Sequence, residues 1–353
     1  MAAPPMHPPE KADGPTVRVE TEGVDGVSNR VQGARRKADY STTAGVKASM
    51  SSLGERQNQP RLIRLLCAVS VAHARAQRLA VLQLGVSVAV AASGVVAAFA
   101  SVTATPITIL GGLWAIAYGA GLAAWGRNEL RRAAVLQEMF DVELLELPWN
   151  PVAAGEPLGG QEVSHLSRQY RRPEARLLDY YIVPAVPRPY DVLGCQQQNL
   201  GWGARIRRRY SRALLTGVGA WSGLGLLVAW PAGLTVPELL LRWYVPSLGI
   251  LLLALETYRA QRDAAVERER LMTMMETRIR STGHEPRPQA AAQLLTFARQ
   301  VQDAIFQSRA RHTRVPDLFF RRFRTRDRID FEVAMADLQR LVTTDPDPDR
   351  RRV

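Results

Sequence analysis

The stretch LAVLQLGVSVAVAASGVVAAFA (residues 79–100), together with ITILGGLWAIAYGAGLAAWG (residues 107–126), decides the fold of this chain. No charged residue occurs from Leu79 to Gly126, a run of 48 positions. A hydrocarbon layer of roughly 30 Å is crossed by about 20 helical residues, so this run is long enough for two membrane spans. The sequence SVTATP (101–106) interrupts the run, and its proline suits the first turn of a new helix. We therefore predict a transmembrane hairpin over residues 79–126.

A second apolar block covers residues 213–255, but it contains Glu238 and Arg242. Its charge-free remainder after Arg242 is too short to span a bilayer alone. The Pro- and Gly-containing sequence 231–237 marks a tight turn, so we predict a third span before this turn and a fourth after it. Arg242 then lies close enough to the interface for its charge to reach water. The alternative is two spans only, with the second block buried inside a soluble helical domain.

The positions of the arginines predict the topology. The formal net charge is +13, yet neither short hairpin turn contains Lys or Arg. By the positive-inside rule, both termini and the central segment are cytoplasmic. Because the basic excess then follows from topology and anionic lipid, we expect no nucleic-acid partner. The arginines beside the predicted spans are Arg75, Arg78, Arg127, Arg131, Arg132, Arg205, Arg207, Arg208, Arg209, Arg212, Arg259 and Arg262.

The chain is expected to be an all-α integral membrane protein with four transmembrane helices, arranged as two hairpins with a cytoplasmic helical module. The ends are polar and lack an apolar face, so we expect them to be disordered. Residues 256–281 alternate charged with scattered apolar residues and are interpreted as a long exposed helix or coiled-coil stalk. After a break, Leu294, Ala298, Val301 and Ile305 recur at helical spacing. The expected segments are a disordered tail (1–57), a lead-in helix (58–78), hairpin 1 (79–126), a central cytoplasmic segment (127–212), hairpin 2 (213–255), a helical C-terminal region (256–342) and a disordered tail (343–353).

The sequence contains no pattern typical of a catalytic, cofactor or metal site. The five histidines are far apart and are interpreted as surface residues: His7, His73, His165, His284 and His312. Gly201-Trp-Gly203 is too short for a phosphate-binding loop. The carboxylates Asp141, Glu143 and Glu146 are interpreted as part of a solvated face. We therefore predict a protein that is not an enzyme, with no cofactor and no metal.

Small residues recur every four positions in the first hairpin. Such ladders allow helices to approach closely in lipid, either within one monomer or between protomers, and the sequence leaves both open. No ionisable group lies near the predicted midplane of this hairpin, which favours an oligomeric pore or a lipid-disrupting bundle over a coupled transporter. The ladder residues are Gly85, Ala89, Ser93 and Ala97 on the first span, and Gly111, Ala115, Gly119 and Ala123 on the second.

Several motifs outside the spans resemble one known family. They are QEMFD (137–141) leading to LPWN (147–150), DYY (179–181), CQQQN (195–199) before Arg205 and Tyr210, and VPD (315–317) with FF (319–320). In order, spacing and membrane pattern, the chain from about Asn58 to Leu341 resembles the S-4TM family. The resemblance implies a pore-forming effector with four transmembrane helices, associated with bacterial nucleotide-cyclase antiphage systems. The chain departs from the family pattern at DYYI (179–182), where DWYP is common, and at Leu318, where an aromatic is common.

The motif residues have both structural and functional interpretations. Singly, the aromatic residues would be core residues, and Asn150, Asp179 and Asn199 would cap helices or close turns. As a set they could form a receptor surface, with Arg171, Arg172 and Arg176 meeting phosphates and Tyr180 or Tyr181 stacking on a base. The candidate signal-sensing residues are Asp141, Trp149, Asn150, Asp179, Tyr180, Tyr181, Cys195, Gln196, Asn199, Pro316 and Asp317.

The resemblance and the membrane pattern together give one functional expectation. A cyclic nucleotide from a cognate nucleotide cyclase would act on the cytoplasmic module, directly or through another protein. The chain would then form a homo-oligomer in the lipid bilayer and permeabilise the bacterial inner membrane, ending the infection with the death of the cell. The alternatives are a non-conducting membrane scaffold and a membrane-embedded transferase.

Overall fold

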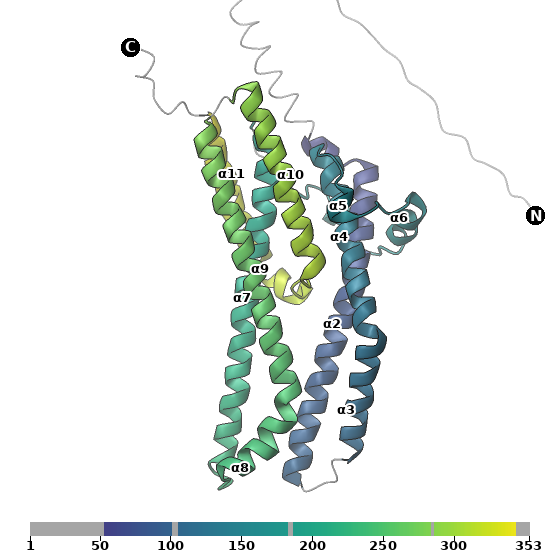
Figure 1. Cartoon of the computed structure of the whole chain (residues 1–353), viewed down its shortest axis with the longest axis vertical. Coiled ribbons are helices and arrows are strands. Elements are labelled where there is room, and N and C mark those ends of the chain that lie inside the picture. Colours follow the sequence, from purple (N-terminus) through teal and green to yellow (C-terminus); the bar gives the residue numbers. More distant parts are fainter. Residues whose placement is uncertain (1–52, 101–104, 183–185, 284–285, 344–353) are drawn as a thin grey trace, which may run out of the picture. The chain divides into compact units, whose positions relative to one another are not determined.

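The computed structural model describes residues 53–100, 105–182, 186–283 and 286–343, all within one compact unit, Lys47–Val353 (Figure 1). The described residues form helices and connecting turns, without strands. The expected disordered tails lie mainly outside the described residues.

The first helix pair consists of α2 (Pro60–Ala100) and a continuous helix that returns antiparallel to it (Figure 1). The returning helix is formed by α3 (Thr105–Ala117), one π-helical turn (Tyr118–Leu122) and α4 (Ala123–Leu145). It ends where Glu146 adopts a left-handed conformation with φ 51°.

The second pair consists of α7 (Tyr190–Ala229) and α9 (Val245–Thr282), joined at one end by α8 (Val236–Leu239) and a π-helical turn (Leu240–Tyr244). Thr235 and Glu238 form a capping box that begins α8 after the turn. Arg242 pairs with Glu238 one turn earlier, with the nitrogen and oxygen 3.7 Å apart. Gly283 ends α9 at φ 77°, a conformation that glycine adopts without strain.

Four continuous helices of 40 to 47 residues are long and apolar enough to cross a membrane. Forty residues rise about 60 Å, twice the roughly 30 Å of hydrocarbon, so each helix extends well beyond its apolar stretch. The apolar stretches expose many large side chains, among them Val88, Leu113, Leu227 and Leu252. The predicted all-α, four-span membrane protein is therefore confirmed.

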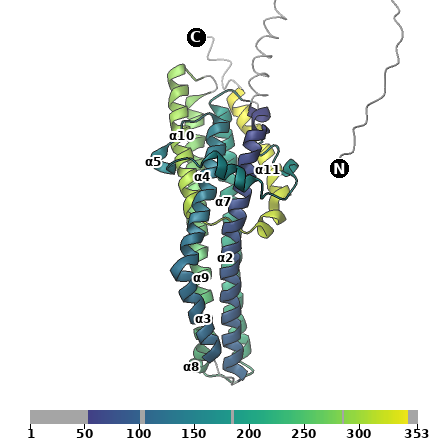
Figure 2. The same ribbon diagram turned by 90° about the vertical axis from the view of Figure 1, so that its right-hand side faces the viewer.

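The remainder, here called the helical module, comprises residues 53–78, 127–212 and 256–343. The extended ends of α2, α4, α7 and α9 are joined there by α5 (Pro151–Ala154), α6 (Gly160–Ser167), a 3-10 turn (Glu174–Arg176), α10 (Pro288–Arg311) and α11 (Asp317–Thr343). Helix α10 packs against α4, α7 and α9, and α11 packs against α7 (Figures 1 and 2). The main hydrophobic core lies in this module and includes Leu66, Phe140, Tyr190 and Ile305.

Residues 256–281 belong to one long helix, as expected, but only one of its faces is exposed. Ala264, Ala265 and Met275 are fully buried where this helix packs along α7. One expected boundary of the module was wrong. Residues 53–57, assigned to the disordered tail, are helical, and the side chains of Leu53 and Gln57 are buried. Gln57 is held there because it exchanges hydrogen bonds with the backbone N–H and C=O of Tyr181.

Close helix approach inside the unit uses different glycines from most of the predicted ladder. A Cβ at Gly94 would lie 2.9 Å from Cβ of Pro246, and one at Gly225 would lie 2.6 Å from the indole nitrogen of Trp243. Of the ladder, Ala97 is buried and Gly111 faces Val90. Most of the others remain exposed, namely Gly85, Ala89, Ser93, Ala115 and Gly119.

Candidate functional site

A cavity of about 1030 Å³ opens in the helical module beside the start of the first apolar stretch. One wall is α2 from Leu66 to Arg78, the last residue before that stretch. The other walls come from the segment 168–182, from α7, from Arg268 on α9, from Arg309 at the end of α10, and from Arg328 on α11. The cavity therefore draws on both helix pairs.

The lining is strongly basic. It contains eleven arginines against a single acidic residue, Asp179. Tyr170, Tyr180 and Trp202 add aromatic surface. Arginine forks bind phosphate oxygens through paired N–H donors, so this lining suits a ligand with several negative charges. The arginines are Arg75, Arg78, Arg168, Arg171, Arg172, Arg176, Arg207, Arg268, Arg309, Arg314 and Arg328.

Four of the basic lining residues are buried: His73 and Arg309 are 7% exposed, Arg207 is 6% exposed and Arg268 is 4% exposed. Arg207 donates to two neutral oxygens, the side-chain carbonyl of Gln261 and the backbone carbonyl of Thr313. Among the described residues, Nε of Arg268, one terminal nitrogen of Arg309 and Nδ1 of His73 have no hydrogen-bond partner. Buried charges are usually paired, and leaving one unpaired costs several kcal/mol, so this arrangement is typical of a binding site.

The pKa values of His73, Arg207 and Arg268 are lowered mainly by burial and to a smaller extent by the positive charges of neighbouring arginines. Burial lowers the pKa of Arg268 well below its usual value, and the charges of Arg207 and Arg309 lower it further. Burial likewise lowers the pKa of Arg207 to about 10, with Arg314 contributing. The pKa of His73 falls to about 3 through burial and then through Arg314, although a hydrogen bond to Gln137 acts in the opposite direction. The imidazole is therefore neutral at physiological pH.

The absence of a side chain at Gly203 allows the guanidinium of Arg268 to pack against α7. A Cβ at this position would lie 2.5 Å from a terminal guanidinium nitrogen of Arg268, so a larger residue would displace the guanidinium. Gly201 gives similar room to the ring of Phe331, since a Cβ there would lie 2.9 Å from the ring. The Gly-Trp-Gly sequence is not a phosphate loop, but both of its glycines are needed for packing beside the cavity.

A buried polar network lies behind the cavity and is centred on Asp141, whose side chain is 1% exposed. Arg309 donates to Oδ2 of this carboxylate at 2.6 Å, and the hydroxyl of Tyr181 donates to Oδ1 at 2.8 Å. Gln302 donates to both Asp141 and Glu138, at 3.2 and 2.8 Å. The interpretation of Asp141 as part of a solvated face was therefore wrong. Its carboxylate is buried between α4 and α10, where it neutralises Arg309.

Glu138 extends the network. Burial raises the pKa of its carboxyl group, whereas hydrogen bonds from Arg299 and Gln302 lower it. Arg299 donates to Oε1 of Glu138 at 2.6 Å. Gln196 joins from α7, donating to the backbone carbonyl of Ala298 at 2.8 Å and to the side chain of Gln302 at 3.1 Å. The network therefore ties α4, α7 and α10 together.

The structure brings the DYY motif and Asn199 to the cavity wall. Asp179, at φ 49°, exchanges two hydrogen bonds with the side chain of Asn58, at 2.9 and 3.0 Å. The hydroxyl of Tyr180 accepts from Gln137 at 2.6 Å. Asn199 lies inside α7 and donates to the hydroxyl of Tyr181 at 3.3 Å, so it does not cap a helix. Both tyrosines line the cavity, but Tyr181 is buried among these groups and is not free to stack on a base, whereas Tyr180 is half-buried.

The remaining motif residues lie away from the cavity. Asn150 caps α5 and donates to Asp303 at 2.9 Å, and Trp149 donates to the backbone carbonyl of Gly155 at 2.9 Å. Cys195 is fully buried, and burial raises its thiol pKa well above the usual value. Pro316 directly precedes α11, which begins at Asp317; the side chain of Asp317 is outside the described residues.

The histidine interpretation was wrong for His73, which is buried because it follows the apolar face of α2. Within the described residues, no group of three or more His, Cys, Asp or Glu side chains is placed to hold a metal ion.

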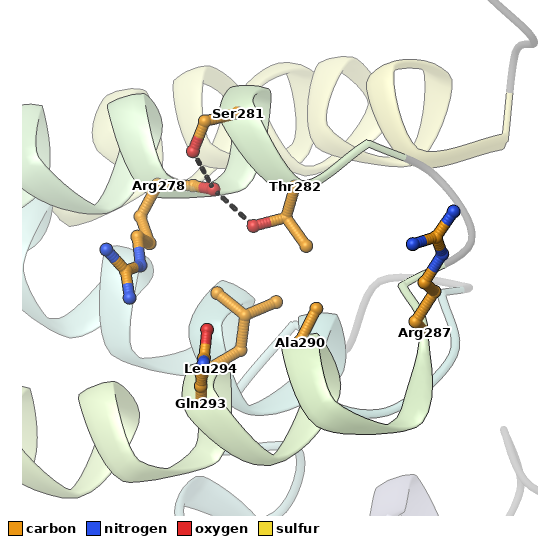
Figure 3. A pocket seen from close by; sticks show the side chains of 7 residues that line it. All are labelled: Arg278, Ser281, Thr282, Arg287, Ala290, Gln293 and Leu294. Atoms are coloured by element: carbon orange, nitrogen blue, oxygen red, sulfur yellow. Dashed lines mark hydrogen bonds between the residues drawn. The ribbon is translucent and has the colours of Figure 1, made fainter.

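A second, smaller pocket of about 410 Å³ lies between the ends of α9 and α10 (Figure 3). The hydroxyls of Ser281 and Thr282 both donate to the backbone carbonyl of Arg278, at 3.0 and 2.8 Å, so they are already satisfied. Arg278 and Arg287 are not buried. This pocket lacks the buried charges that distinguish the larger cavity.

Comparison with known proteins gives two matches. The family model described as the SMODS-associating 4TM effector domain matches residues 51–338. A protein of Bacillus cereus (strain VD146), described as a probable CBASS effector molecule, is 24% identical over 216 residues. The matched region covers 60% of this chain and 70% of that protein. No solved structure matches the chain.

Proposed function

The chain belongs to the family of SMODS-associating 4TM effector domains, and from this membership we propose the following function. The protein is a multi-pass membrane effector of bacterial antiphage immunity. A nucleotide second messenger made by a cognate cyclase binds in the basic cavity. The four apolar helices then assemble with those of other copies and permeabilise the inner membrane. The infected cell dies, and its death ends the infection.

The observation that carries this proposal is the cavity lined by eleven arginines beside the apolar stretches. A nucleotide signal brings phosphates that arginine forks bind and bases that aromatic side chains can stack on. Tyr180 and Trp202 supply such surfaces, from the segment 168–182 and from α7. The matched relative's description as a probable CBASS effector supports the same class of signal.

The position of the cavity supplies a route to the membrane. Arg75 and Arg78 come from α2 in the first pair, whereas Arg207 and Arg268 come from α7 and α9 in the second. A polyanion that binds all four couples the two pairs within the helical module, next to the start of the apolar stretch of α2. Such a ligand shifts a resting state toward an active state only to the extent that it binds the active state more tightly.

The exposed small residues support association between copies. Gly85, Ala89 and Ser93 of α2 are exposed, as are Ala115 and Gly119 of the returning helix. Within the described part of the chain, a Cβ at Gly85 or Gly119 would meet no atom within 4 Å. Small-residue faces of this kind allow helices of separate copies to approach in lipid. In this proposal, both termini are cytoplasmic and the hairpin tips face outward.

A non-conducting membrane scaffold is the competing function, because it also needs a receptor cavity and membrane anchors. The discriminating experiment triggers the partner cyclase in bacteria that express the chain and follows uptake of a membrane-impermeant DNA dye. The triple variant in which Arg171, Arg172 and Arg176 become Ala removes three exposed cavity charges. Its control removes three exposed charges of α9 outside the cavity, Arg262, Arg270 and Arg280.

We expect dye uptake in the parent and the control but not in the cavity variant. Asp179→Ala and Asn199→Ala are also expected to lose signal-dependent uptake. A triggered parent that halts phage replication while excluding the dye would favour the scaffold. Equal dye uptake in the cavity and control variants would show that the cavity arginines are not needed for the response to the signal.

A further inference from the structure

We propose that His73, Arg268 and Arg309 form a phosphate-binding subsite in the buried part of the cavity. The ligand class is a phosphate or phosphodiester group, carried either by a soluble signal or by a lipid headgroup. As the part of the receptor cavity that fixes a phosphate of the signal, the subsite rests on the proposed function. Its existence is nevertheless testable by binding alone.

The three residues converge from three helices, since His73 lies on α2, Arg268 on α9 and Arg309 on α10. All three line the same cavity. The charge of Arg309 acts on both of the others, lowering the pKa of His73 and of Arg268. An anion seated in this part of the cavity lining would contact all three.

Each residue has an unused donor or acceptor position. Nε of Arg268, one terminal nitrogen of Arg309 and Nδ1 of His73 have no partner among the described residues. Arg309 can hold an anion without releasing Asp141, because the nitrogen that bonds Asp141 is the other one of its fork. A phosphate oxygen accepts from several donors at once, so one group can satisfy both guanidinium positions.

The charge balance also points to an anion. Among the described residues, Asp141 is the carboxylate that pairs with Arg309, whereas Arg207 and Arg268 have no carboxylate within ion-pair distance. Two buried guanidinium groups thus remain uncompensated beside His73. A bound phosphate supplies the missing negative charge, and its presence favours protonation of the imidazole.

Gly203 fixes the geometry of the subsite. It lets the guanidinium of Arg268 lie directly against the backbone of α7, in the space that a Cβ would occupy. Gly203→Ala therefore keeps every charge and moves only the end of Arg268. If the position of the Arg268 guanidinium matters, this variant weakens phosphate binding. If only the total positive charge of the cavity matters, the variant binds phosphate like the parent.

The experiment uses the full chain in phosphatidylcholine nanodiscs, with inorganic pyrophosphate as the probe. Calorimetry gives the affinity, and thermal unfolding gives Tm with and without the probe. The variants are Arg268→Met and Gly203→Ala. Their controls are Arg270→Met, an exposed arginine of α9, and Gly217→Ala, a position of α7 with open space around it.

Arg268→Met is expected to raise Tm without the probe, because an uncompensated buried charge is removed, and to weaken pyrophosphate binding at least tenfold, or about 1.4 kcal/mol. Gly203→Ala should weaken binding as well, and both controls should bind like the parent. A lower probe-free Tm for Arg268→Met with unchanged affinity would show a structural arginine and overturn the proposal. Absence of pyrophosphate binding by the parent in neutral nanodiscs would also overturn it, unless the lipid arm below shows occupancy.

The lipid arm repeats the titration in nanodiscs containing phosphatidylglycerol. If the anionic lipid raises Tm of the parent but not of Arg268→Met and blocks pyrophosphate, the subsite holds a headgroup phosphate. If pyrophosphate affinity is unchanged, the subsite takes a soluble phosphate. Normal pyrophosphate binding without signal-dependent dye uptake would support the subsite and contradict the proposed permeabilisation. The experiments therefore distinguish failure of the subsite from failure of the proposed function.

Discussion

Asp141 is the buried carboxylate that neutralises Arg309 in the wall of the cavity. It accepts from Arg309, Tyr181 and Gln302 inside the protein and joins the cavity wall to the network behind it. Asp141→Asn keeps the side-chain shape but leaves Arg309 buried without a counter-charge. We expect a loss of about 3–5 kcal/mol in the free energy of unfolding.

Glu143→Gln is the matched control. Glu143 pairs with Arg61, an exposed side chain, and exposed pairs contribute about 0–1 kcal/mol. Denaturant unfolding in nanodiscs measures both variants. Equal stability of Asp141→Asn and Glu143→Gln would show that Arg309 is not held by Asp141.

His73 gives the protein a specific acid sensitivity. Its pKa is about 3 in the folded protein against an ordinary value of 6.5, so between these values the unfolded chain binds a proton that the folded protein does not. The contribution is fully present above about pH 6.5 and is lost as the pH falls toward 3, by about 1.4 kcal/mol per pH unit.

Unfolding measured from pH 7 to pH 5 on the ligand-free protein should therefore show a shallower fall in stability for His73→Gln than for the parent. His312→Gln is the comparison, because burial lowers the pKa of this half-buried histidine less strongly. Parallel pH profiles of His73→Gln and the parent would mean that the fold does not lower the pKa of His73.

The buried charges of the site had a recognisable signal in the sequence, although we missed it. Arg309 continues the helical spacing of Leu294, Ala298, Val301 and Ile305, and Arg268 lies on the same buried face of α9 as Ala264 and Met275. A charged residue on an apolar stripe must be compensated or functional. The convergence of these residues could not be predicted, because it depends on the packing of helices far apart in the sequence.

At the scale of helices, some glycines lie in close contact with a side chain of another helix, and others have open space around them. Gly225 accommodates Trp243 within the second pair, whereas Gly119 has open space around it. Gly225→Val should destabilise the monomer by about 1–3 kcal/mol through overpacking, and Gly119→Val should leave it almost unchanged. Thermal unfolding of the two variants in detergent checks this difference, and equal effects would show that the pairs pack otherwise.

The exposed ladder should matter between copies. Ser93→Leu or Gly119→Leu is expected to reduce cross-linked oligomers and dye uptake while membrane insertion is retained. Gly249→Leu, at another glycine with open space, is the control. If oligomers and uptake survive bulky residues along both ladders, these faces do not mediate assembly.

The helices themselves were largely predictable. Hydropathy and length predicted the four spans, and the turn signals at 101–106 and 231–237 placed the hairpin ends close to where α2 and α7 end. The burial of α9 beyond the apolar stretch was not predicted, since its partners on α2 and α7 are remote in the sequence. Apolar patterning predicts an element more reliably than it predicts the neighbour of that element.

At the scale of the whole molecule, the positions of the arginines predict the topology. Cysteines placed at Thr103 and Leu234 should react with an impermeant thiol reagent in intact cells, whereas one placed at exposed Gly159 should not. Native Cys67 and Cys195 are buried and report nothing on sidedness, so they can remain in place. Labelling at Gly159 in intact cells would contradict the four-span topology.

In the proposed mechanism, a nucleotide bound between the two helix pairs opens the membrane. The most direct measurement is release of a trapped dye from liposomes that contain the purified chain, with and without the purified product of the partner cyclase. We predict release only when the product is present, and its loss in Arg268→Met but not in Arg270→Met. Equal release with and without the product, or no release with the product, would exclude this mechanism.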